Sequence, residues 1–297
     1  MTHLTSARSM RGDDPMGSVL STVGPEVISE IARSRALLAF DFDGTLAPIV
    51  ADRHAAAMRG ETRALFRAAA LLYPCAVISG RTRADVAARV DGVPLVAVVG
   101  CHGAEPGFGP LDRALVRRAA SWLPELEAGL RGCEGVEIED KRFGIAIHYR
   151  MARSWPDAER RALAAASALA GATVFRGRAV VNVLPQEALT KGDAIASLCE
   201  RLGARAAVYV GDDRTDEDAF RSEAVAVSIG IGEARDSAAA HRLPEQSHVD
   251  DLLRALVRAR MEQDGRGTRW EGLVRAMRPF PGAGGSPLVS ERPAGHR

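Results

Sequence analysis

The sequence has almost no net charge and few cysteines. Its 39 lysines and arginines against 38 aspartates and glutamates leave a formal charge of +1. No overall field therefore attracts nucleic acid or a membrane, and partners must be inferred from local sites. The four cysteines are far apart and form no CxxC pair, which argues against a zinc site and a disulfide framework. Cys75 and Cys199 lie in apolar segments, as expected for buried thiols of a cytoplasmic protein.

The two ends of the chain lack regular patterns. Residues 1–26 are polar and contain no apolar run of the kind that a signal peptide needs, so we interpret them as an N-terminal tail. Residues 263–297 are rich in Gly, Pro and Arg and are expected to form a disordered C-terminal tail. With 46% hydrophobic and 26% charged residues, the whole chain has the composition of an ordinary soluble globular protein.

Short apolar segments alternate with stretches of helical periodicity in much of the remaining chain. We expect buried strands at residues 36–40, 75–78, 95–99, 206–210 and 225–229. Strands that alternate with helices predict an α/β fold, a doubly wound parallel sheet with helices on both faces. We assign this Rossmann-like core to residues 27–108 and 186–262. Ligands of such sheets bind beyond the carboxyl ends of the strands.

Residues 109–185 break this pattern. A helix is expected over 111–130, followed by strands at 136–140 and 143–150 in which apolar residues alternate with polar or small ones. Ser154 can begin a helix that runs to about residue 170, and strands at 173–176 and 179–184 flank a turn at Gly177. The order αββαββ predicts a compact α+β unit inserted into the parallel domain, with one face of its antiparallel sheet covered.

Two carboxylates follow the first expected strand directly. Asp41 and Asp43 are two residues apart, so on an extended backbone their side chains point the same way. They repel each other unless a cation lies between them or one is protonated. The pair therefore suits a hard cation, or a nucleophile beside a general acid. The alternative is a turn or a helix cap, because Asp-Gly and Thr are common at both.

A second group of acids follows the expected strand at 206–210. Five carboxylates lie between residues 212 and 218, and a Mg²⁺ ion shared with Asp41 would supply the counter-charge that they need. Acids at a helix N-terminus are the alternative, which suits Glu217 and Asp218, whereas Asp212 and Asp213 suit the metal better.

A phosphate beside this metal would need hydrogen-bond donors and a further positive charge. Ser79 with the backbone around Gly80 can donate, and Lys191 can place an ammonium at the start of a helix. Each signal is weak alone, because a lysine is more often a solvated surface residue.

Taken together and in this order, these segments resemble the haloacid dehalogenase-like phosphatases, which carry DxDGT, then a serine, a lysine and an acidic GDD segment. The resemblance implies that Asp41 is the nucleophile that forms an aspartyl-phosphate. It implies that Asp43 protonates the leaving alcohol and then activates water, and that Ser79 and Lys191 bind the phosphoryl group. It places Mg²⁺ at Asp41, the Asp43 backbone carbonyl and Asp212, with Asp213 and Asp216 in support.

Longer matches resemble the trehalose-6-phosphate phosphatase family. They are residues 41–49, Ser79-Gly80-Arg81, residues 102–105, His148-Tyr149-Arg150 and residues 211–220. The resemblance implies that the inserted unit is a cap that closes over a sugar phosphate and excludes water. It implies a role in trehalose biosynthesis, with trehalose-6-phosphate synthase as the candidate pathway neighbour. The residues expected at the substrate are Thr45, Gly80, Arg81, His102, Glu139, Lys141, Arg142 and Arg178. For His102, a structural hydrogen bond at the domain hinge is an equal alternative.

One segment departs from the family pattern. Asn182 and Leu184 stand before Pro185 where many members carry an acidic and a basic residue. The substrate therefore stays open between trehalose 6-phosphate and another sugar or cyclitol phosphate, such as sucrose 6-phosphate, a glucosylglycerol phosphate or an aminocyclitol phosphate. A third hypothesis is a non-catalytic subunit that binds a sugar phosphate or a synthase. The presence of every expected catalytic residue argues against it.

Overall fold

The computed structural model describes residues 22–234, 236–265, 269, 272 and 274–275. Most of the two tails expected at 1–26 and 263–297 lies outside these residues. Among the helices that the structure describes, none combines the length and apolar character needed to cross a bilayer.

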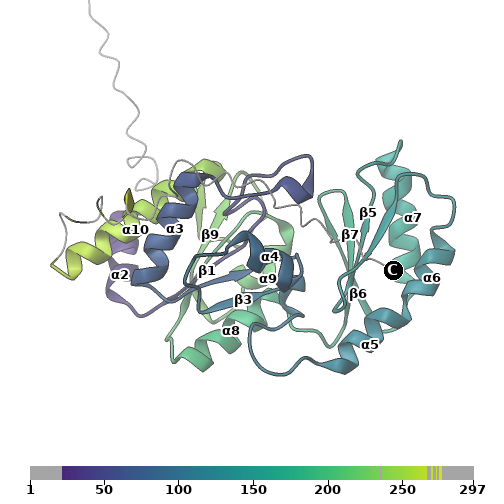
Figure 1. The fold of residues 1–297 in the computed structure, drawn as a ribbon, viewed down its shortest axis with the longest axis horizontal. Helices are drawn as coiled ribbons and strands as arrows, with labels where there is room; N and C mark the ends of the chain where they lie inside the picture. Colours follow the sequence, from purple (N-terminus) through teal and green to yellow (C-terminus); the bar gives the residue numbers. More distant parts are fainter. Residues whose placement is uncertain (1–21, 235, 266–268, 270–271, 273, 276–297) are drawn as a thin grey trace, which may run out of the picture.

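The larger sheet has six parallel strands in the order β10-β9-β8-β1-β2-β3 (Figure 1). The strands are β1 (Leu37–Phe40), β2 (Cys75–Ile78), β3 (Ala97–Val99), β8 (Ala207–Gly211), β9 (Val225–Ile231) and β10 (His241–Leu243). The first five coincide with the expected strands. The sequence analysis missed β10, because three residues at a sheet edge, two of them polar, form no apolar run.

Helices cover both faces of this sheet, which confirms the doubly wound α/β fold. On one face, α2 (Pro25–Arg33), α3 (Gly60–Leu72), α4 (Arg83–Arg89) and α10 (Val249–Gln263) share one hydrophobic cluster with the strands (Figure 1). On the other, α8 (Lys191–Leu202) and α9 (Glu217–Phe220) pack through a second cluster. Helix α3 begins only at Gly60, and the residues just before it are not α-helical. Residues 53–55 form instead a 3-10 turn, η1 (Arg53–Ala55), whose N-terminus is capped by Asp52.

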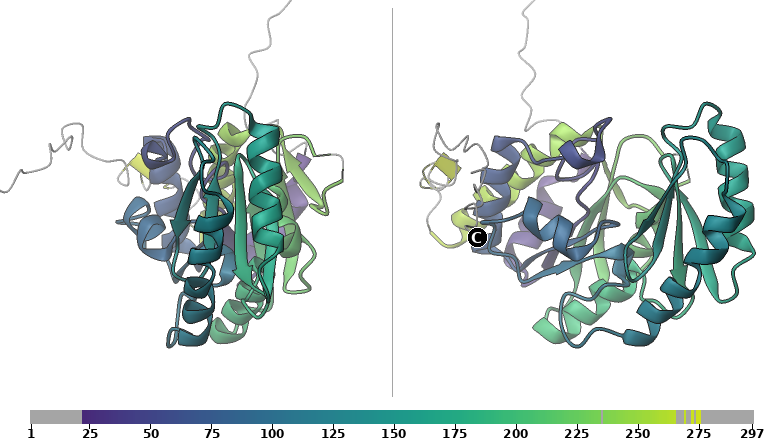
Figure 2. Two further views of the ribbon diagram at one scale, coloured as in Figure 1. Left: turned by 90° about the vertical axis from the view of Figure 1, so that its right-hand side faces the viewer. Right: turned by 45° about the vertical axis from the view of Figure 1, so that its right-hand side comes forward.

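The inserted unit, which we call the cap, contains a four-stranded antiparallel sheet. Its strands are β4 (Glu137–Asp140), β5 (Ile145–His148), β7 (Val180–Pro185) and β6 (Ala172–Gly177), in that spatial order. Three helices, α5 (Arg113–Ser121), α6 (Leu123–Gly129) and α7 (Trp155–Ser167), cover the face that points away from the larger sheet (Figure 2). Ser154 caps α7 as expected. The α+β cap is thus confirmed, and residues 109 and 185 stay our predicted limits for it.

Two local expectations for the cap are wrong. The single helix expected over 111–130 is interrupted at Trp122, which ends α5 and precedes α6. Pro124 explains the interruption, because proline has no N–H to continue the helical hydrogen bonds. The turn expected at Gly177 is made by Arg178 and Ala179, with Ala179 at φ +57°, and Gly177 is the last residue of β6.

The uncovered face of the cap sheet, which we call the cap face, lies opposite the larger sheet (Figure 2). Residues paired across neighbouring antiparallel strands project from the same side of a sheet. Two such rows form the cap face: Glu139, Ala146, Asn182 and Phe175, and Glu137, His148, Val180 and Gly177. The alternate residues, such as Ile147 and Val181, are buried against the cap helices.

Candidate active site

The expected catalytic segments meet at one edge of the larger sheet. Asp41 follows β1, Ser79 follows β2 and Asp212 follows β8, and these three strands are neighbours in the sheet. Parallel strands end at the same edge, so segments that are far apart in the sequence are brought together there. Gly44 lets the chain turn away beside Asp212. Its φ is +81°, and a Cβ atom at this position would lie 1.9 Å from Asp212 Oδ2.

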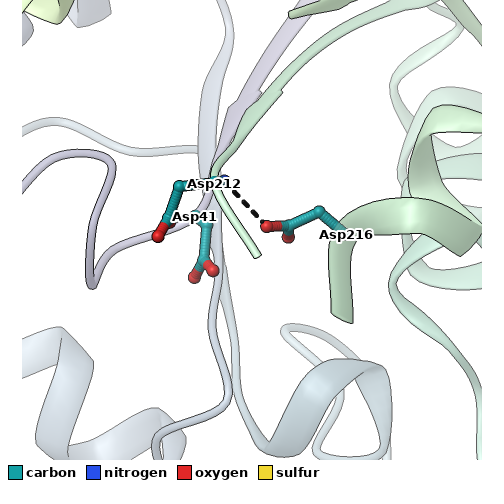
Figure 3. Close-up of side chains that lie close together, drawn as sticks. All are labelled: Asp41, Asp212 and Asp216. Atoms are coloured by element: carbon teal, nitrogen blue, oxygen red, sulfur yellow. Dashed lines mark hydrogen bonds between the residues drawn. The ribbon is translucent and has the colours of Figure 1, made fainter. Parts of the chain in front are cut away.

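Three carboxylates gather at this edge. Asp41, Asp212 and Asp216 each offer an oxygen, and these oxygens lie within 4.8 Å of one another. Figure 3 shows Asp41 and Asp212 side by side, with Asp216 directed toward them from the other side. We call these three residues the acid cluster. Asp43, whose backbone carbonyl was the expected ligand, does not contribute its side chain to the cluster.

Asp216 holds the cluster together. Its Oδ1 accepts hydrogen bonds from Lys191 Nζ at 2.6 Å and from the Tyr209 hydroxyl at 2.6 Å. Its Oδ2 accepts the backbone N–H groups of Asp212 and Asp213, both at 2.9 Å. Four donors occupy this carboxylate, so Asp216 fixes the loop after β8, and Asp41 and Asp212 are better placed to bind a cation directly.

Lys191 is the buried cation of the site. It is the first residue of α8, where Thr190 and Asp193 form a capping box. Its Nζ lies 2.9 Å from Asp41 Oδ2, and its side chain is only 1% exposed. Burial alone would lower the pKa of Lys191, but Asp216 and Asp41 raise it above its ordinary value. Lys191 is therefore an ammonium held between two carboxylates.

The electrostatics of the acid cluster fit a divalent cation. Burial and the negative charge of Asp216 raise the pKa of Asp41 to about 7, although the positive charge of Lys191 opposes this rise. Burial, followed by the charges of Asp41, Asp216 and Asp213, raises the pKa of Asp212 well above its usual range. Neighbouring buried carboxylates of this kind are stabilised by a bound hard cation such as Mg²⁺. Asp213 lies on the cavity wall and caps the turn η3 (Arg214–Asp216).

Asp43 is bound by an arginine. Arg81 Nε lies 2.6 Å from Asp43 Oδ2, and Arg81 Nη2 lies 2.7 Å from Asp43 Oδ1. The same guanidinium donates through Nη1 to Asp85 at 2.7 Å. Such a two-point ion pair fixes the direction of the carboxylate as well as its position.

The other core residues expected at the site take different places. Ser79 is buried, and its Oγ accepts the backbone N–H of Arg81. Thr45 is also buried and donates through Oγ1 to Asp212 at 3.1 Å. Gly80 lines the cavity next to His102, whose ring would lie 2.4 Å from a Cβ atom at Gly80.

His102 lies between the core and the cap. Its ring packs edge-on against Phe175 of the cap, with ring centroids 5.0 Å apart. Burial, aided by the charges of Lys191 and Lys141, lowers the pKa of His102 well below its usual value. The neutral ring lines the cavity near Asn182, where one nitrogen can donate and the other accept.

A cavity of about 1060 Å³ separates the acid cluster from the cap face. From the cap it is lined by Glu139, Lys141, Arg178 and Asn182, among others. Lys141 Nζ donates to the Gly80 carbonyl at 2.9 Å, so this lysine joins cap to core. Arg142, in contrast, is exposed, has φ +68° and is not part of the cavity wall.

Comparison with known proteins identifies the family. A family model described as trehalose-phosphatase matches residues 39–243. This chain belongs to the trehalose-phosphatase family.

Relatives agree with this assignment. The probable trehalose-phosphate phosphatase D of Arabidopsis thaliana is 30% identical over 260 residues, which span 78% of this chain and 70% of that protein. A trehalose-phosphate phosphatase of Mycobacterium avium is 42% identical over 195 residues, 61% of this chain and 49% of that protein. The C-terminal domain of C. albicans trehalose-6-phosphate phosphatase has a TM-score of 0.66 at 20% identity, covering 80% and 98% of the two chains. That likeness shows the fold, a parallel α/β core with an inserted antiparallel cap.

The sequence analysis missed several residues around the acid cluster and the cap face. Tyr209 was assigned only to a strand, although a tyrosine in an apolar run signals a buried hydroxyl that needs a partner. His148 was noted as part of a motif but given no role. Arg53 was given no role in the sequence analysis. Its side chain contacts Glu139 and His148 of the cap face.

Proposed function

We propose that this protein hydrolyses trehalose 6-phosphate to trehalose and phosphate, with Mg²⁺ as cofactor and an aspartyl-phosphate intermediate. The observation that carries the proposal is the position of Asp41. It lies at the end of β1, hydrogen-bonded to the buried Lys191, beside Asp212, and it faces a cavity closed by a polar cap sheet. Membership of the trehalose-phosphatase family supports the reaction class.

In the proposed first step, a carboxylate oxygen of Asp41 attacks phosphorus, and the bond from phosphorus to the sugar oxygen breaks. Asp43 gives a proton to that leaving oxygen. In the second step, water attacks the phosphorus of the aspartyl-phosphate and gives a proton to Asp43, and the bond from phosphorus to Asp41 breaks. Covalent catalysis thus divides one difficult displacement into two easier ones.

The charges of the site support these steps. Lys191 holds Asp41 in position and places positive charge beside the phosphoryl oxygens, and the buried Ser79 shapes the loop around them. When bound, Mg²⁺ would neutralise the negative charge between nucleophile and phosphoryl group, held by Asp41, Asp212 and the Asp43 carbonyl, with Asp213 and Asp216 in support.

The ion pair of Asp43 with Arg81 adds a requirement. Both Asp43 oxygens accept N–H groups of Arg81, so this ion pair competes with a hydrogen bond between Asp43 and the leaving group. We propose that the substrate phosphoryl group offers Arg81 an alternative anion and so frees Asp43.

The cavity fits a substrate larger than a monosaccharide phosphate. Its volume of about 1060 Å³ is at the upper end of common small-molecule sites, which run to roughly 1,000 Å³. Glu139, Lys141, Arg178 and His102 would hydrogen-bond sugar hydroxyls there. The second candidate substrate is another sugar or cyclitol phosphate. Asn182 leaves it open, because this buried neutral amide lies in the middle of the cap face. A trehalose-6-phosphate synthase would be the pathway neighbour only in the first case.

The test is phosphate release by the purified protein with Mg²⁺ across a panel of sugar phosphates. We expect a preference for trehalose 6-phosphate that is lost in Asp41→Asn and after treatment with EDTA. Metal-dependent release that favours another sugar phosphate would retain the mechanism and change the substrate. Equal release by Asp41→Asn would remove Asp41 from the nucleophile role, and no release by the wild-type protein on any ester would favour the non-catalytic subunit.

A further inference from the structure

Arg53 connects the core to the cap through its side chain. It lies in η1, on the core side of the cavity, and reaches strands β4 and β5. Its Nη1 lies 2.5 Å from Glu139 Oε2 and 2.6 Å from His148 Nε2, and its Nη2 lies 3.6 Å from Glu137 Oε1. All three partners project from the cap face, so one guanidinium holds two strands of the cap against the core.

The backbone of the same residue connects to the residue that holds Asp43. The Arg53 carbonyl accepts a hydrogen bond from Arg81 Nη2 at 2.7 Å. Arg81 uses that nitrogen and Nε to bind Asp43, and uses Nη1 to bind Asp85. Arg53 thus contacts the cap with its side chain and the partner of Asp43 with its main chain.

We propose that Arg53 is a positioning residue that couples contact with the cap to the placement of Arg81 and Asp43. The inference rests on the proposed function for the role of Asp43 as proton donor. The position of the Arg53 carbonyl depends on how firmly η1 is held, and its side chain holds η1 to Glu139 and His148 when the cap is docked. A displacement of the cap would thereby alter the placement of Asp43 through Arg53 and Arg81.

The contacts require an arginine. The planar guanidinium presents several N–H groups in a fixed geometry and can bind Glu139 and His148 at once, which a flexible ammonium does less well. His148 Nε2 also lies 2.8 Å from Glu139 Oε2. This one ring nitrogen can accept from Arg53 or donate to Glu139, but not both at once, and its tautomer decides which.

The first test compares two small phosphate esters that do not reach the cap, an aryl ester with a good leaving group and an alkyl ester with a poor one. Only the alkyl ester depends strongly on a proton from Asp43. In Arg53→Gln we expect kcat/KM to fall about tenfold more for the alkyl than for the aryl ester, with a smaller difference in Arg53→Lys. The matched control is Arg176→Gln, because Arg176 pairs with Glu159 inside the cap. It should leave the ratio of the two esters unchanged.

The second test is hydrogen exchange without substrate. We expect faster exchange in residues 50–55 and 79–83, and in β4 and β5, for Arg53→Gln but not for Arg176→Gln. An unchanged ester ratio together with unchanged exchange at 79–83 would overturn the proposal.

Asp43→Asn separates this inference from the proposed function. If that variant loses both esters equally, or if the wild-type protein cleaves neither ester, the assigned role of Asp43 fails. Exchange at 79–83 then decides alone whether Arg53 positions Arg81: faster exchange in Arg53→Gln supports it, and unchanged exchange overturns it.

Discussion

The acid cluster and the cap face hold their polar side chains in different ways. Around Asp216, buried side chains and backbone N–H groups form a closed network in which Lys191 is 1% exposed. Where the cap face meets the core, Glu139 of the cap face and Arg53 of η1 keep 28% and 29% of their side chains exposed. Their partners are other long side chains rather than backbone.

Under the proposed function, this difference assigns the reaction to the acid cluster and the choice of substrate to the cap face. The acid cluster is fixed by strand ends and by a capped helix, so its geometry does not depend on the cap. The cap face is held by long side chains that can exchange a protein partner for a sugar hydroxyl. Substitutions in the cluster should therefore affect every phosphate ester. Substitutions of cap residues that do not contact Arg53 should affect mainly sugar phosphates.

The largest expected effect comes from removing the buried cation. Lys191→Met keeps a similar chain length but leaves Asp41 and Asp216 without their shared ammonium. Breaking a buried ion pair in this way should lower the free energy of unfolding by about 3–5 kcal/mol. Hydrolysis of small and sugar esters should be lost together. Urea denaturation and phosphate release measure the two effects, and a variant that loses only sugar-phosphate activity would contradict the comparison.

The cluster was also the more predictable region. Its members are distant in the sequence: Asp41 and Asp212 are 171 residues apart (212 − 41), and Lys191 lies between them. Asp41 and Asp212 meet because the strands before them are parallel and end at one edge of the sheet. The apolar runs of these strands made that arrangement predictable. The helix start at Lys191 follows from a local pattern, because Thr190 is followed three residues later by Asp193.

The contacts between core and cap could not be derived in the same way. Arg53 and Glu139 are 86 residues apart and meet only because the cap docks over η1. No local pattern encodes that docking, and the Arg81–Asp43 pair likewise depends on the distance between two loops. The break at Trp122, in contrast, could have been predicted from Pro124, which follows it by two residues.

A smaller and more selective effect is expected at Lys141. This side chain lines the cavity and donates to the Gly80 carbonyl, away from the acid cluster. Lys141→Ala should lower kcat/KM for the preferred sugar phosphate about tenfold or more, the cost of a lost charge-assisted hydrogen bond. A small aryl phosphate should be nearly unaffected.

Arg142→Ala is the matched control for Lys141→Ala. Arg142 was also expected at the substrate, but it is exposed and outside the cavity wall. We expect no change on either ester. Equal losses on both esters in Lys141→Ala would show that the lysine does not select the substrate, and a selective loss in Arg142→Ala would show that the cap moves further than this structure implies.

The smallest expected effect is a pH dependence of stability at Glu139. Burial would raise the pKa of Glu139, but the hydrogen bond with His148 and the charges of Lys141 and Arg53 lower it to about 2, from an ordinary 4.5. A depressed pKa means that the unfolded chain binds the proton more tightly, so the stabilisation is complete above pH 4.5 and is lost as the pH falls toward 2. At neutral pH, Glu139→Gln should cost no more than about 1 kcal/mol, because the pair is partly exposed. Urea denaturation of both proteins at about pH 7 and about pH 3.5 should show this difference shrinking at the lower pH. A difference that holds or grows would mean that the Glu139 contacts do not depend on its charge, and the cap face would then be as firmly held as the acid cluster.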